Sequence, residues 1–389
     1  MIDFVFQNPA KIIFGRDALH HLGAEVLRYG KRVLLVYGGG SVKRSGLFDQ
    51  VMAILAGGGV AVWELGGIVP NPRLSRVYEG IDICRKAKID LVLALGGGSA
   101  IDTAKGIANG VPYDGDVWDF YSAKATPKAV LPLGTILTIP AAGSEMSYSS
   151  VITNEDGMLK RGYNSVTNVP AFSLLNPEWT FTLPPYQTAC GCVDIMAHMM
   201  ERYFTLVEHV ELTDRLIAAG IRTVLNNAPK VMAKPDDYDA RAELMWTGAL
   251  AHNTLLHTGR IGDWGSHKVE HELSASFDIA HGAGLAIVFP AWMKYAVMQH
   301  PKKIAQFAVD VMDVPTDFGN DTDTALEGIR RLEVFYRSLG MPTRLADVGL
   351  ENADYAALAN RALPNEEATV GEYIKLTRKD FVAIYELAK

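Results

Sequence analysis

The chain has 389 residues, 49% of them hydrophobic and 21% charged, which is an ordinary globular composition and a length that predicts about two domains. The net charge of −7 and the lack of a long basic run argue against nucleic acid as a partner. We expect no membrane span and no signal peptide, because no apolar run is long enough and the start carries an early acid. The three cysteines predict no disulfide framework, so we expect a cytoplasmic protein.

Short apolar segments alternate with amphipathic ones over the first half of the chain. Segments 32–39, 60–67, 89–98 and 134–143 are rich in β-forming residues and contain glycine at or near their ends, as buried parallel strands do. The intervening stretches 45–56, 73–88 and 99–110 have helical character. This alternation predicts a Rossmann-like α/β domain over residues 1–185, with the glycine loops at the carboxyl edge of the sheet, where ligands bind. The amino-terminal segment 1–23 also alternates like a strand, and we expect a strand over residues 1–9.

The pattern changes near residue 185. Pro177, Pro184 and Pro185 interrupt the chain, and almost every later segment has a helical period. We therefore predict a second, all-helical domain over residues 186–389.

The segment 96–99 reads GGGS and joins a buried strand to a helix. Glycines let backbone amides approach an anion, and the helix N-terminus adds a positive dipole, so a pyrophosphate fits there. The segment is not a GxGxxG fingerprint, and ordinary turn chemistry is the alternative. Asp102, one turn into the helix, either favours the helix dipole or faces the cofactor.

A second glycine loop, at 36–46, bears on the choice of nicotinamide cofactor. An NAD-specific site places an acidic residue at such a strand end to bind the ribose hydroxyls. Here the position holds glycines and Ser41, followed by Lys43 and Arg44. A hydroxyl and two cations suit a 2′-phosphate, so the loop favours NADP(H), with NAD(H) as the other possibility. Alternatively, the two cations are solvated residues at a helix start.

Five polar residues in the second half have the spacing of a metal site. Asp194 and His198 are four residues apart, as are His267 and His271, and His281 follows shortly after. Residues at i and i+4 share one helix face, so each pair can direct two ligands at one point. Imidazole and carboxylate together suit Zn²⁺ or Fe²⁺. Histidines hydrogen-bonded within a core are the competing interpretation.

The chain resembles the iron-containing (group III) alcohol dehydrogenase family over essentially its whole length. The matching motifs are GGGSAIDTAK (96–105), PAAGSE (140–145), residues 176–203 and HKVEHELSASFDIAHGAGLAIVFP (267–290). Segments 37–51, 68–73 and 262–273 are similar to the butanol dehydrogenase branch of NADPH-dependent aldehyde reductases. The resemblance implies a dehydroquinate synthase-like architecture.

The resemblance also implies roles for individual residues. The metal ligands fall on Asp194, His198, His267 and His281. His271 matches a pocket histidine beside the nicotinamide and is our candidate proton relay. The positions that match the cofactor site are Gly39, Gly40 and Ser41 (2′-phosphate), Asn71 (adenosine side), Gly97, Gly98 and Ser99 (pyrophosphate), Asp102 (carboxamide), and Thr138, Ser147 and Lys160 (ribose and nicotinamide).

The implied activity is hydride transfer between NAD(P)H and a short-chain aldehyde or primary alcohol such as butanol, assisted by Fe²⁺ or Zn²⁺. A glycerol or diol dehydrogenase of the same family is an alternative. A non-redox lyase like dehydroquinate synthase is another, although few cations lie near the ligands in the sequence to receive its anionic substrate. Family resemblance further implies a homodimer, in which segment 1–9 pairs with its mate across a two-fold axis.

Overall fold

The computed structural model describes all 389 residues and divides them into two compact units. An α/β unit comprises residues 7–183 and 235–254, and a helical unit comprises residues 1–6, 184–234 and 255–389. One break lies between Leu183 and Pro184, near the expected boundary at 185–186.

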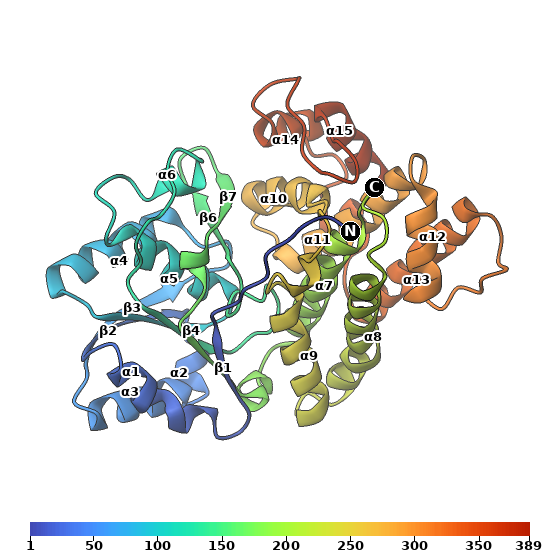
Figure 1. The fold of residues 1–389 in the computed structure, drawn as a ribbon. Helices are drawn as coiled ribbons and strands as arrows, with labels where there is room; N and C mark the ends of the chain where they lie inside the picture. The colour runs from blue at the N-terminus through green and yellow to red at the C-terminus, as the bar shows by residue number, and fades with distance from the viewer. The chain divides into compact units, whose positions relative to one another are not determined.

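The α/β unit is built on a six-stranded parallel sheet of order β1-β8-β5-β4-β2-β3, with a separate antiparallel hairpin of β6 and β7 (Figure 1). The strands are β1 (Lys11–Phe14), β2 (Arg32–Gly38), β3 (Ala61–Ile68), β4 (Leu91–Gly96), β5 (Leu133–Leu137), β6 (Ser149–Asn154), β7 (Leu159–Asn164) and β8 (Phe172–Leu175). Its helices are α1 (Leu22–Leu27), α2 (Ser41–Arg44), α3 (Leu47–Gly57), α4 (Leu74–Ala87), α5 (Gly98–Gly110), α6 (Trp118–Tyr121) and α9 (Tyr238–Ala251).

Helices cover both faces of the sheet, as the sequence predicts. Successive residues of a strand point to opposite faces, so Val33 and Leu35 of β2 pack with α1 and α3, whereas Leu34 and Val36 pack with α4 and α5. Figure 1 shows α1 and α3 on one side of the sheet and α4 and α5 on the other. Because both faces are covered, the central strand β4 is buried along its whole length, which explains its uninterrupted apolar sequence.

The strand expected at residues 1–9 is absent. Residues 1–10 form no strand, and the first strand is β1, at Lys11–Phe14. It pairs with β8, which lies between β1 and β5. β1 lies within segment 1–23, whose alternation resembles a strand. β8 has only four residues, too few for a clear alternating pattern, and was not predicted from the sequence.

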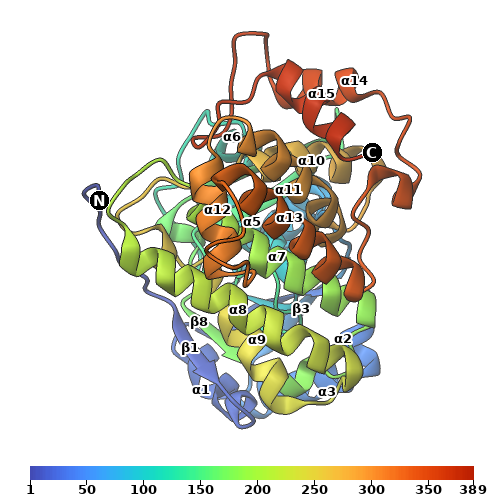
Figure 2. The ribbon, with the colours of Figure 1, turned by 90° about the vertical axis from the view of Figure 1, so that its right-hand side faces the viewer.

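The helical unit contains the remaining long helices. They are α7 (Pro185–Tyr203), α8 (Glu211–Ala233), α10 (Gly265–Phe277), α11 (His281–Val297), α12 (Pro301–Asp310), α13 (Asp321–Ser338), α14 (Tyr355–Ala362) and α15 (Arg378–Leu387). Helix α11 is almost entirely buried and packs against α7, α10, α12, α13 and α15; Figure 2 shows α12 and α13 beside it. A helix that is apolar on all sides belongs in the centre of a bundle.

Two segments belong to a different unit from the one that the sequence predicts. Helix α9 was expected in the helical domain, but its Met245 and Ala249 complete the α4–α5 core of the α/β unit. Residues 1–6 belong to the helical unit, where the Ile2 amide donates to the Gly259 carbonyl (3.1 Å). Helical periodicity identifies a helix but not the core that its apolar face joins.

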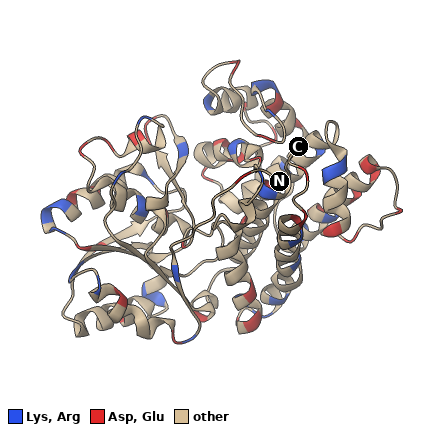
Figure 3. Ribbon diagram, viewed as in Figure 1, with Lys and Arg blue, Asp and Glu red and all other residues tan.

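None of the helices combines the length and apolar character that a membrane span requires. Figure 3 shows cations and anions interspersed along the ribbon of both units.

Candidate metal centre and nucleotide loops

Three helices of the helical unit bring the predicted metal ligands together. Asp194 and His198 lie one turn apart on α7, His267 lies in the first turn of α10, and His281 is the first residue of α11. The side chains of Asp194, His198 and His267 are buried, and that of His281 is partly exposed.

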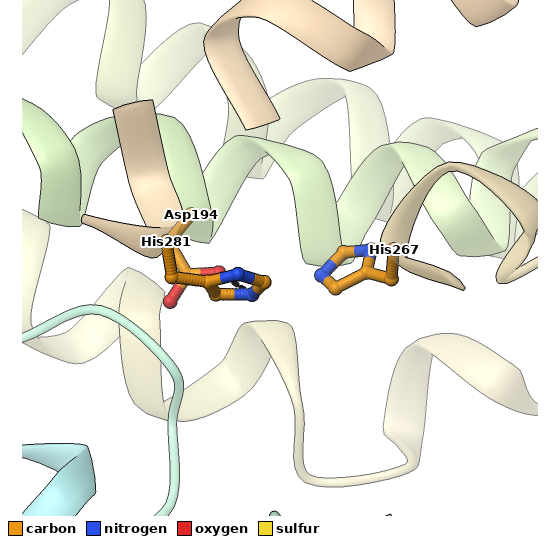
Figure 4. Close-up of side chains that lie close together, drawn as sticks. All are labelled: Asp194, His267 and His281. Atoms are coloured by element: carbon orange, nitrogen blue, oxygen red, sulfur yellow. Dashed lines mark ion pairs between the residues drawn. The ribbon is translucent and has the colours of Figure 1, made fainter. Parts of the chain in front are cut away.

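The donor atoms of Asp194, His267 and His281 lie within 4.8 Å of one another. Figure 4 shows the His267 ring pointing toward Asp194 and His281 from the opposite side. The Nε2 atom of His281 is 3.8 Å from Asp194 Oδ1, and His198 Nδ1 is 3.2 Å from the same oxygen. The rings of His198 and His267 have centroids 4.8 Å apart. The structure therefore gathers the four predicted ligands in one place.

The chemistry of this group fits a divalent metal. Burial, followed by the neighbouring His267, holds the pKa of His198 well below its usual value, so its ring is neutral near pH 7. Neutral imidazoles and a carboxylate are the protonation states that bind a cation. Three imidazoles and one carboxylate suit Zn²⁺ or Fe²⁺.

His271 lies next to this group. Its ring centroid is 6.4 Å from that of His267 and 5.7 Å from that of His281. Glu270, His271 and His281 form a second set whose possible donor atoms lie within 4.8 Å of one another.

Two buried glutamates at this centre were not predicted from the sequence. Glu201 contacts His267, and Glu270 contacts His281. The signal is their spacing: Glu201 follows His198 by three residues, and Glu270 follows His267 by three, so each shares a helix face with a predicted ligand. Burial raises the pKa of Glu201 above its usual value.

In the α/β unit, Gly97 precedes α5, whose first two residues are Gly98 and Ser99. A β-carbon at Gly97 would lie 3.1 Å from Ile139, and one at Gly98 would lie 3.3 Å from Ala142. Side chains would therefore crowd this loop, and glycines leave its backbone accessible at the helix N-terminus, as an anion site requires.

Asp102 and Ser147 belong to a buried polar network beneath this loop. Ser144 Oγ donates to Asp102 Oδ1 (2.5 Å), and the Val151 amide donates to Oδ2 (2.9 Å). Lys105 Nζ donates to Ser147 Oγ (3.2 Å). Lys105 was not predicted as a site residue from the sequence. Burial lowers the pKa of its ammonium to about 8. These contacts hold the loop before β6 against α5.

Two other predicted nucleotide residues contact each other. Lys160 Nζ donates to Asn71 Oδ1 (3.0 Å), and both side chains are buried. The Thr153 amide donates to the Pro72 carbonyl (2.8 Å), which fixes the hairpin to this loop. Thr138 follows β5, and its amide donates to the Gly96 carbonyl (3.0 Å).

The segment predicted to bind the 2′-phosphate, residues 39–41, follows β2 and ends at Ser41, the first residue of the short helix α2. The Lys43 side chain has close neighbours there. Its ammonium lies 4.9 Å from the ring centroid of Tyr37 and 4.3 Å from that of Phe48. Glu64 Oε2 is 3.6 Å from Lys43 Nζ and accepts a hydrogen bond from the Tyr37 hydroxyl (2.7 Å). The sequence analysis did not anticipate this carboxylate.

Comparisons with known proteins cover the whole chain. Residues 9–177 match the family described as iron-containing alcohol dehydrogenase, and residues 188–389 match the C-terminal part of the Fe-containing alcohol dehydrogenase family. The chain is 45% identical to a probable NADH-dependent butanol dehydrogenase of Bacillus subtilis (strain 168), with 99% of each chain covered. It is 34% identical to an NADPH-dependent aldehyde reductase of Escherichia coli (strain K12), with 100% of each covered.

A solved structure supports the same assignment. The NADH-dependent butanol dehydrogenase A of Thermotoga maritima superposes with a TM-score of 0.95 at 39% identity, covering 99% of this chain and 98% of that one. The fold class expected from the sequence is confirmed. The chain belongs to the iron-containing alcohol dehydrogenase family.

Proposed function

We propose that this protein is a metal-dependent reductase of short-chain aldehydes that also oxidises the corresponding primary alcohols, such as butanol, with NAD(P)H as the redox partner. The convergence of Asp194, His267 and His281 donor atoms within 4.8 Å carries the proposal. Full-length similarity to relatives named butanol dehydrogenase and aldehyde reductase supports the alcohol and aldehyde chemistry.

In the proposed mechanism, the site would use the Lewis acidity of a divalent metal to polarise the carbonyl oxygen and the hydride of a reduced nicotinamide to reduce the carbonyl carbon. Asp194, His198, His267 and His281 would hold the metal. Their burial lowers the local dielectric and so strengthens their electrostatic effect on a charge that develops at the substrate oxygen.

The chain's own groups would also hold the nucleotide and move a proton. The amides of Gly98 and Ser99 would bind the pyrophosphate at the start of α5. His271 would relay a proton to the oxygen of the product alcohol, a role that suits an imidazole near neutral pH.

The preference for NADP(H) stays a prediction, and two observations weigh against it. Lys43, one of the two cations expected to bind the 2′-phosphate, lies beside Glu64. Relatives between 41% and 46% identical are named NADH-dependent, whereas the relative named NADPH-dependent is 34% identical.

The decisive experiment follows nicotinamide absorbance with butanal and compares three proteins. Wild type should oxidise NADH or NADPH. Asp194→Ala should lose both bound metal and activity, because it removes the only predicted carboxylate ligand. His271→Ala should keep its metal while turnover falls by about 10²–10⁴-fold, the usual contribution of a proton-transfer group.

Each variant can contradict its own part of the proposal. An Asp194→Ala enzyme with full activity would exclude the metal mechanism. Unchanged turnover in His271→Ala would exclude the proton relay.

A further inference from the structure

Two glutamates beside the metal centre are fully buried. Glu201 lies on α7 and Glu270 on α10, and each has a relative exposure of 0%. A carboxylate removed from water destabilises the fold unless it has close partners. The partners of these two glutamates include the predicted metal ligands.

The Glu201 carboxylate contacts both the start of α10 and the ring of His267. It accepts hydrogen bonds from the Trp264 amide (2.5 Å), the Ser266 hydroxyl (2.6 Å) and the His267 amide (3.1 Å). Helix α10 has no side-chain cap of its own, so Glu201 satisfies amides that the helix start would leave unpaired. Its Oε1 atom also lies 2.6 Å from His267 Nδ1. With Nδ1 held by a carboxylate, Nε2 is the nitrogen left for a metal.

Glu270 contacts Nδ1 of His281, as Glu201 contacts Nδ1 of His267. Its Oε2 atom contacts His281 Nδ1, and its Oε1 atom accepts from the Ser274 hydroxyl. Gly284 leaves room for this carboxylate, since a β-carbon there would lie 2.5 Å from Oε1. The opposite nitrogen of His281, Nε2, is the one 3.8 Å from Asp194 Oδ1.

This geometry distinguishes between the two sets of possible ligands that share His281. A metal held by Glu270, His271 and His281 would compete with the contact between Glu270 and Nδ1. A metal held by Asp194, His267 and His281 uses Nε2 and leaves that contact intact. Glu270 therefore fits a supporting role better than a ligand role.

We propose that Glu201 and Glu270 are positioning residues of the metal centre. Each carboxylate fixes the tautomer and ring orientation of one histidine ligand, so that both Nε2 atoms point toward Asp194. The support passes from helix to helix, because Glu201 of α7 holds His267 of α10, and Glu270 of α10 holds His281 of α11. This inference rests on the metal site of the proposed function.

The test measures Co²⁺ binding to the metal-stripped, full-length protein by titration, together with the visible absorption spectrum of the bound ion. Glu270→Leu should weaken binding by about 10–100-fold, as loss of such a partner does in other metal sites, and should change the Co²⁺ spectrum. Glu270→Gln keeps an oxygen that can accept from Nδ1, so it should recover much of the affinity. Glu201→Gln should likewise weaken binding less than Glu201→Leu.

Glu272→Gln is the matched control. Glu272 is a buried carboxylate on the same helix, 3.7 Å from Arg361 Nε, and its replacement should leave Co²⁺ affinity and spectrum unchanged. Wild-type affinity and spectrum in Glu270→Leu and Glu201→Leu would overturn this inference alone. A wild-type protein that binds no Co²⁺ would overturn the proposed function as well.

Discussion

Charged side chains near both candidate sites are buried and held by specific partners. Lys105 donates to the carbonyls of Ser147 and Ser149. Glu201 accepts from three donors around the start of α10 and contacts Nδ1 of His267. Such groups are difficult to recognise in a sequence, because Lys and Glu are usually exposed. The spacing of two polar pairs, each four residues apart in apolar helices, predicted a metal site here, and the family resemblance implied which four residues are its ligands.

At residue scale, Glu64 should reduce the affinity for NADPH. In Glu64→Gln the ammonium of Lys43 loses its carboxylate partner and becomes available to a 2′-phosphate. An exposed ion pair contributes little, so we expect NADPH to bind a few-fold more tightly, with NADH little changed. Fluorescence titration gives both dissociation constants.

The control for this substitution is Glu79→Gln, which removes an exposed carboxylate paired with Arg76 in the same unit. If both variants show the wild-type ratio of the two dissociation constants, Glu64 has no part in cofactor choice.

Glu145 should give the protein a measurable pH dependence. Burial raises the pKa of this side chain from 4.5 to about 7. Between these values the folded protein binds more protons at this site than the unfolded chain does, so stability from this group is complete below pH 4.5 and is lost as the pH rises through 7. Gln at this position does not titrate.

The free energy of unfolding of Glu145→Gln should therefore rise relative to wild type between about pH 5 and pH 8, by at most about 3 kcal/mol. Urea unfolding at the two pH values measures the difference. If the free energies of unfolding of the two proteins change with pH in parallel, Glu145 keeps an ordinary pKa.

At the scale of elements, the proposed metal centre depends on how closely α11 approaches α7. Gly282 follows His281 directly, and a β-carbon there would lie 2.2 Å from the carbonyl oxygen of Cys190 on α7. This obstacle is backbone, which cannot move aside as a side chain can. The two helices therefore require glycine where they cross, and that crossing sets the separation of His281 from Asp194.

Gly282→Ala should destabilise the helical unit by about 1–3 kcal/mol, as overpacking does elsewhere, and should also weaken Co²⁺ binding. Thermal unfolding and metal titration measure the two effects. Gly57→Ala is the control, because a β-carbon at Gly57 in α3 meets nothing within 4 Å, and it should change stability by less than about 1 kcal/mol. A Gly282→Ala protein with normal stability and affinity would show that the crossing tolerates a methyl group.

At the scale of the whole molecule, local patterns predicted the elements better than their assembly. The strands β2 to β4 and the helices α3 to α5 lie within two residues of their predicted bounds, because long apolar runs and glycine loops identify them. Strand β5 ends at Leu137, well before the predicted end at residue 143. The assignment of α9 and of residues 1–6 depends on contacts distant in sequence, which periodicity does not contain. Glu201 and Glu270 each share a helix face with a predicted ligand, but the histidine that each contacts lies on another helix, which their spacing does not show.

The homodimer stays a prediction. Phe4, Val5 and Phe6 are exposed, which gives the amino-terminal segment an apolar surface of the kind that a second copy would cover. Sedimentation analysis that finds only monomers at micromolar concentration would exclude it.

The most direct measurement of the central claim is a Zn²⁺ or Fe²⁺ titration of metal-stripped protein during reduction of butanal by NADH or NADPH. The proposed metal centre predicts that activity is lost on stripping, returns in proportion to added metal, and saturates at one ion per chain. Full activity without metal, or wild-type recovery in an Asp194→Ala variant, would contradict the account.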